Sequence, residues 1–114
     1  MGEDPLFKVF GTCYETDTTI LATDPYTTDR DNMVSMAQQL LRSDGDYFGV
    51  IDENNVTLQF MMDDAGGVWM EIPIPSKNGS YGKRIQIQDL EGTLLLVGVC
   101  FEPEEIGGME FQQW

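Results

Sequence analysis

The chain of 114 residues contains no histidine and only two cysteines, Cys13 and Cys100. Without histidine, the Ser–His and Cys–His pairs that activate a nucleophile cannot be built. Zinc sites made of cysteine and histidine are excluded as well, because the two cysteines form no CxxC pattern. Cysteines so far apart are expected to be small buried residues, and a disulfide between them stays open until their separation is known.

Long apolar runs are also missing. No stretch of about 18 apolar residues occurs, so the sequence predicts no transmembrane helix. The first ten residues, MGEDPLFKVF, lack the basic and then apolar segments of a secretory signal, and Met1–Asp4 are expected to fray. Gly79–Lys83 lacks the spacing of a phosphate-binding loop. We therefore expect a cytoplasmic protein that is not an enzyme, carries no cofactor and does not bind a membrane.

Basic residues are scarce. Six Lys and Arg stand against twenty Asp and Glu, which gives a net charge of −14. This exceeds the magnitude of roughly 2–8 that is enough to keep a small domain soluble. A field of this sign repels nucleic acid and anionic membranes and attracts basic proteins. The charge favours a protein partner with a basic binding surface and no nucleic acid, with plain solubility as the alternative.

The most regular part of the chain is Tyr47–Pro75, which predicts three strands joined by turns at Asp52–Asn55 and Asp63–Gly67. Apolar residues alternate along it, as a sheet with one buried face requires. The predicted buried set is Val56, Leu58, Phe60, Met62, Val68, Met70, Ile72 and Ile74.

A helix is predicted from about Asp29 to Ser43, because apolar residues recur there at helical spacing. This stripe consists of Met33, Met36, Ala37, Leu40 and Leu41. Thr28 or Asp29 can cap its first turn, and Gly45 can take the left-handed closing position. The stripe is expected to pack on the apolar face of the sheet.

The flanking segments extend this core. Further strands are predicted at Leu6–Phe10, near Thr18–Ala22, at Lys83–Gln88 and at Met109–Trp114, with a loop at Ser76–Gly82. The segment 90–101 fits either a short helix capped by Asp89, which is slightly favoured, or a buried strand over Leu94–Phe101. The predicted fold is a single α+β domain over residues 1–114. It is an antiparallel meander of about five strands with one amphipathic helix on one face and a possible second short helix.

Acidic residues gather in the predicted turns. Antiparallel strands place the turns at Ser43–Asp46, Asp63–Gly67 and Asp89–Glu91 at one end of the sheet. We name this end the acidic rim and predict that it attracts a basic surface; it comprises Asp44, Asp46, Asp63, Asp64, Asp89 and Glu91. The alternative is that turns favour Asp for local hydrogen bonding alone. These carboxylates also offer oxygen ligands for Ca²⁺, but the EF-hand spacing is absent and no metal site is predicted.

Three side chains are expected on the face opposite the apolar one: Gln59, Met61 and Trp69, with Glu71 following on the same side. Left uncovered, an aromatic residue and a Met beside an acidic rim are typical of a protein interface. Alternatively, Trp69 and Tyr47 line a ligand pocket or cover a sheet edge. The predicted partner-binding residues are Asp44, Asp46, Met61, Asp63, Asp64, Trp69, Glu71 and Asp89.

The layout from about Met33 to Leu96 resembles the small acidic immunity proteins that accompany bacterial polymorphic and contact-delivered toxins. The likeness lies in a helix ending in LLRSDGDYFGVID and in the strands VTLQFMMD and GVWMEIPIP. It implies a small α+β cytoplasmic protein that binds one cognate toxin and often covers its active site, and it assigns no residue a role. The alternatives are a nucleic-acid-mimicking inhibitor of a defence nuclease and a small-ligand or Ca²⁺-binding module.

Overall fold

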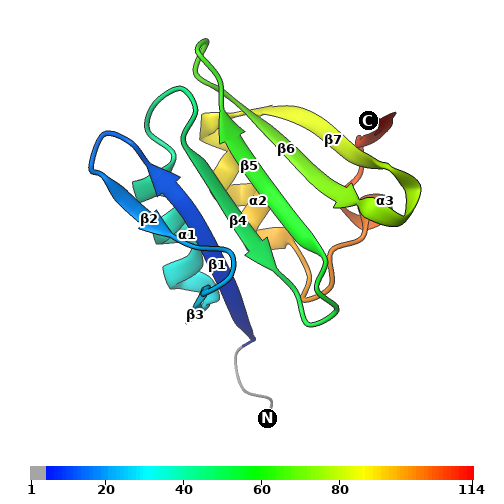
Figure 1. The fold of residues 1–114 in the computed structure, drawn as a ribbon, viewed down its shortest axis with the longest axis horizontal. Helices are drawn as coiled ribbons and strands as arrows, with labels where there is room; N and C mark the ends of the chain where they lie inside the picture. The colour runs from blue at the N-terminus through cyan, green and yellow to red at the C-terminus, as the bar shows by residue number, and fades with distance from the viewer. Residues whose placement is uncertain (1–4) are drawn as a thin grey trace.

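The computed structural model describes residues 5–114, and the expectation for Met1–Asp4 lies outside this range. Its centre is an eight-stranded antiparallel sheet in the order β2-β1-β4-β5-β6-β7-β8, with β3 also paired to β1 (Figure 1). The strands are β1 (Leu6–Cys13), β2 (Thr18–Ile20), β3 (Tyr26–Asp29), β4 (Tyr47–Ile51), β5 (Thr57–Met62), β6 (Gly67–Ile74), β7 (Gly79–Gln86) and β8 (Glu110–Gln113).

The α+β prediction is confirmed, but about five strands was too few. The short strands β2, β3 and β8 lie at the sheet edges, and most of their side chains are exposed. The segments that contain β2 and β8 were predicted as strands, whereas β3 was not, because a strand that buries little shows no strong alternation. The predicted loop Ser76–Gly82 was also wrong in part, because Gly79–Gly82 already pairs with β6.

Helix α1 (Arg30–Leu40) begins where the sequence predicted, since the Asp29 carboxylate accepts a 2.9 Å hydrogen bond from the Asn32 N–H. It ends at Leu40 and not near Ser43. Leu41 leaves the helical conformation with φ −89° and ψ 84°, and the N–H groups of Arg42 and Ser43 turn to another acceptor, the Asp46 carboxylate. Gly45 has φ +88° in the turn before β4 and does not close the helix.

The open question over residues 90–101 is answered by a helix, α2 (Leu90–Leu96), in which Leu90 and Leu94 are buried. Arg30 Nη1 donates to the carbonyls of Leu94 and Val97 at 2.8 Å each, so α1 holds the C-terminal end of α2. Short helices η1 (Pro75–Lys77), η2 (Ile87–Asp89) and α3 (Pro103–Ile106) complete the described elements. Ile87, predicted to point inward from a strand, lies in η2 and is exposed.

The core lies between the sheet and the helices α1 and α2, on what we name the inner face. Figure 1 shows both helices behind the sheet. Among residues 5–114, no helix lies over the face of β4, β5 and β6 that is turned to the viewer, which we name the outer face. Most of the predicted buried set is buried, and Val56 and Ile74 pack against it partly buried. Alternation along the strands therefore assigned the inner face correctly.

Both cysteines are free: Cys13 is buried in β1 and Cys100 is half-buried in the segment after α2. Within residues 5–114, no helix has the length and apolarity needed to cross a membrane.

Candidate functional site

The outer face carries a pocket of about 350 Å³ over β1, β4, β5 and β6. We name it the outer pocket; it is lined by Phe10, Tyr47, Gln59, Phe60, Met61, Trp69 and Glu71. Two neighbouring rows of cross-strand partners build it. One row joins Tyr47, Met61 and Trp69, and the other joins Phe10, Gly49, Gln59 and Glu71. The structure thus brings together the predicted residues Met61, Trp69 and Glu71.

Two glycines allow aromatic rings to lie against the sheet. A Cβ atom on Gly49 would stand 2.1 Å from Cζ of Phe10, and one on Gly82 would stand 2.4 Å from Cζ2 of Trp69. Larger residues at these positions would push the rings away from the backbone. The Phe10 ring also lies 6.5 Å from the Tyr47 ring, centroid to centroid, at a tilt of 57°. The pocket walls are therefore aromatic and fixed by packing.

Glu71 is held in place by three hydrogen bonds. Its Oε1 accepts from Gln59 Nε2 at 2.6 Å, and its Oε2 accepts from Trp69 Nε1 at 3.1 Å and from Ser80 Oγ at 3.2 Å. The ion pairs among residues 5–114 are Arg42–Glu15 and Arg84–Asp63, so no cation of the described chain is paired with Glu71. The outer pocket combines apolar walls with one oriented carboxylate.

The turns of the predicted acidic rim lie at one end of the sheet, but its carboxylates differ in exposure. The turns before β4 and after β5 lie side by side, since Gly45 N–H donates to the Met62 carbonyl at 3.0 Å. Asp44 and Asp64 are exposed there. The last residue of β7, Gln86, pairs with Gly67 at this same end of the sheet. Asp89 follows shortly after in η2 and is exposed. The rim adjoins the outer pocket, because Met62, which contacts the turn before β4, directly follows the pocket residue Met61.

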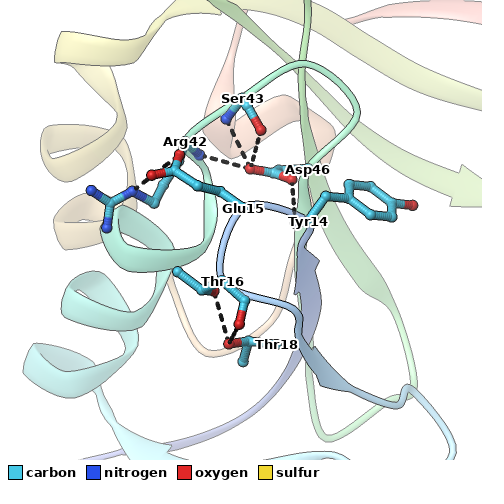
Figure 2. A network of polar contacts seen from close by, with 7 residues as sticks. All are labelled: Tyr14, Glu15, Thr16, Thr18, Arg42, Ser43 and Asp46. Atoms are coloured by element: carbon cyan, nitrogen blue, oxygen red, sulfur yellow. Dashed lines mark hydrogen bonds and ion pairs between the residues drawn. The ribbon is translucent and has the colours of Figure 1, made fainter.

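The prediction that Asp46 belongs to an exposed rim was wrong, because this residue is fully buried. Its Oδ1 accepts from the Tyr14 N–H at 2.9 Å, and its Oδ2 accepts from Arg42 N–H, Ser43 N–H and Ser43 Oγ (Figure 2). Burial alone raises the pKa of Asp46, but the hydrogen bonds from Tyr14, Ser43 and Arg42 outweigh it and leave the pKa below its ordinary value. Asp46 therefore ties the end of β1 to the turn before β4.

Asp63 is partly engaged within the chain. Its Oδ1 accepts from the N–H groups of Ala65 and Gly67 at 2.9 Å each, which shapes the β5–β6 turn. Its Oδ2 accepts from Arg84 Nε at 2.8 Å. The hydrogen bond from Arg84 and that from Gly67 lower the pKa of Asp63 to about 2. Because Arg84 balances this charge, Asp44 and Asp64 are the more available acids of the two turns.

Two residues of structural weight were not predicted. Phe10 follows Val9 in β1, and since neighbours in a strand face opposite sides, this adjacent apolar pair signals an aromatic ring on the outer face. Asp52 is a buried carboxylate that accepts from the N–H groups of Asn54, Val56 and Phe101. Asp52 fastens the segment after α2 to the β4–β5 turn.

A second cleft of about 440 Å³ lies between α2 and the segment that includes α3. Its lining mixes Lys83 with Asp89, Glu102 and Glu105, so charges of both signs are present. Cys100 also lines it, but burial and the nearby Glu53 raise the pKa of this thiol, the opposite of what an activated nucleophile needs. Among the described residues, no group of three or more His, Cys, Asp and Glu side chains is placed to hold a metal ion.

No protein-family model, curated protein or solved structure matches this chain. Function is therefore inferred from the chemistry of the outer face. Among the described residues, the lining of the outer pocket consists of aromatic and apolar side chains with Gln59 and one carboxylate, Glu71. This arrangement suits binding.

Proposed function

We propose that the protein is a non-catalytic inhibitor that binds one basic protein, as an immunity protein binds its cognate toxin. One observation carries the proposal: the outer face is uncovered, and it combines an aromatic pocket with neighbouring exposed carboxylates in a chain of net charge −14. The charge excess and the apolar contact area thus lie on connected parts of the surface.

The two parts would act at different stages of binding. Exposed carboxylates such as Asp44 and Asp64 steer a basic surface towards the rim and raise the association rate. Met61 and the half-buried Trp69 and Tyr47 supply contact area in the complex, and Met and aromatic residues are enriched at interface centres. Inhibition would follow because a toxin that handles phosphate groups needs a basic cleft, which this face would cover.

The test begins with capture. The tagged protein is used to retain partners from lysate of its source cells at low and moderate salt, and each partner is then expressed alone and with the protein. We expect one stoichiometric partner with a basic binding domain that is harmful alone and harmless in co-expression. Retention of generic basic proteins that all leave at moderate salt would refute the proposal.

A pair of double variants tests the steering role of the rim. Asp44→Lys with Asp64→Lys should slow association with the captured partner by about tenfold or more at low salt, and by little at high salt. Asp24→Lys with Glu104→Lys makes the same charge change at exposed positions away from the rim and should have a smaller effect. Equal association rates for the two double variants would contradict the assignment of the rim.

A further inference from the structure

We propose that the outer pocket receives a single arginine side chain of the partner, with Glu71 as its counter-ion. This inference rests on the proposed function and deepens it, because it names the group that the pocket binds. It draws on three features of the pocket: its aromatic walls, its acceptor floor and the absence of a cation of its own.

The walls suit a flat cation. The rings of Phe10, Tyr47 and Trp69 line the pocket, and those of Phe10 and Tyr47 are tilted by 57° to each other. A guanidinium group stacks on aromatic rings and is attracted to their negative faces, and it is less strongly hydrated than an ammonium group. The volume of about 350 Å³ accommodates one long side chain with a few water molecules.

The hydrogen-bond acceptors in the pocket, Glu71 and Gln59, suit a group that donates two parallel hydrogen bonds. A carboxylate has about four acceptor sites, and the three hydrogen bonds to Glu71 leave one of them free on Oε1. The Gln59 amide must turn its nitrogen to this carboxylate, so its carbonyl oxygen remains as a second acceptor beside it. Two neighbouring acceptors match the paired N–H groups of arginine better than the single ammonium of lysine.

Within residues 5–114, the chain does not fill the pocket with a cation of its own. No Lys or Arg lines it, and Arg84, the cross-strand partner of Trp69, is turned to Asp63. The cleft beside α2 differs in this respect, because Lys83 lines it among its acids. A carboxylate without a paired cation, set among aromatic rings in an acidic protein, is complementary to an incoming positive charge.

The first test uses small probes and the free protein. The indole N–H signal of Trp69 is followed by NMR while N-acetyl-arginine methylamide is added, with the Trp114 indole as an internal reference. We expect a saturable shift of the Trp69 signal at millimolar concentration, a weaker response to the lysine analogue, and none to the citrulline analogue, which is isosteric with arginine but uncharged. An equal response to citrulline or to a leucine analogue would overturn the inference.

Variants then separate this inference from the proposed function. Glu71→Gln should weaken probe binding at least fivefold. Met61→Lys should do the same by placing a cation at the pocket wall, at a position that is 51% exposed and tolerates change. Gln38→Lys adds the same charge at an exposed site on α1 and serves as the control. If the captured partner binds all of these variants as it binds the wild type, the arginine inference fails and the inhibitor proposal stands; if no partner is captured while the probe still binds, the reverse holds.

Discussion

The two faces of the sheet are built from the same strands but differ in burial. In β5, Leu58 and Phe60 point to the inner face and are at most 1% exposed, whereas Met61 points to the outer face and is 51% exposed. The inner face is covered by α1 and α2, and no helix of the described part of the chain lies over the outer face (Figure 1). An exposed apolar side chain such as Met61 contributes little to stability, and in the proposed function it supplies contact area for the partner.

The polar groups of the outer face strengthen this contrast. Across residues 5–114, no buried side-chain polar atom lacks a hydrogen-bond partner. On the outer face, however, Glu71 is fixed by Gln59, Trp69 and Ser80 although it pairs with no described cation. Asp46 and Asp52 are oriented in the same way but are buried, whereas Glu71 lines a pocket, where an oriented carboxylate without a paired cation can bind an incoming positive charge. The comparison predicts that changes on the inner face alter stability and changes on the outer face alter binding.

The largest expected effect comes from a pair of substitutions in one strand. Leu58→Ala leaves a cavity in the core and should lower the free energy of unfolding by about 2–5 kcal/mol. Met61→Ala removes an exposed side chain and should change it by no more than about 0.5 kcal/mol. Urea unfolding followed by circular dichroism measures both. Met61→Ala should weaken partner binding more than Leu58→Ala does. A Met61→Ala variant as unstable as Leu58→Ala would contradict the difference between the two faces.

Sequence reasoning worked where one physical pattern dominated. Alternation in β5 and β6 assigned the inner face, and helical spacing with a capping Asp29 gave the start of α1. It failed where several weak preferences compete. The edge strand β3 was not predicted, because it buries little and its pairing with β1 depends on residues distant in the sequence.

The candidate site was predictable only in part for a related reason. Met61, Trp69 and Glu71 were predicted to share a face because they follow the period of a strand. Whether a turn aspartate is exposed depends on which N–H groups meet it, and the Tyr14 N–H that reaches Asp46 comes from another strand end, 32 residues away. The sequence therefore predicted the position of Asp46 in the turn but not its burial.

The next prediction concerns Asp46, which belongs to the stability side of the comparison. Asp46→Ala leaves several buried N–H donors without an acceptor. It should lower the free energy of unfolding by about 2–3 kcal/mol at neutral pH. Since the pKa of Asp46 is lower in the folded protein, its stabilisation is present above the ordinary value of 3.8 and is lost as the pH falls through the lower folded value.

Urea unfolding of Asp46→Ala between pH 2 and pH 7 checks both statements. The stability gap to the wild type should narrow in acid. The exposed neighbour Asp44, changed to Ala, should leave stability nearly unchanged at every pH. A gap for Asp46→Ala that stays constant down to the lowest pH would mean that its charge is not what stabilises the turn.

The smallest effect on stability is expected at the surface pair Arg84–Asp63. This pair also matters for binding, because Arg84 balances one negative charge of the acidic rim. Arg84→Gln should raise the pKa of Asp63 from about 2 towards 3.8, since the hydrogen bond from Arg84 is the main cause of its low value. The stability that this carboxylate contributes should then be lost at a higher pH during acidification, because a lowered folded pKa protects only above that value. A carboxyl NMR titration measures the pKa of Asp63 as the midpoint, with Arg42→Gln as a control whose partner is Glu15.

A midpoint that stays near 2 would mean that the N–H groups of Gly67 and Ala65 are sufficient to stabilise the charge of Asp63. If instead the midpoint rises, the same variant exposes an unbalanced carboxylate at neutral pH, and association with a basic partner should become faster at low salt.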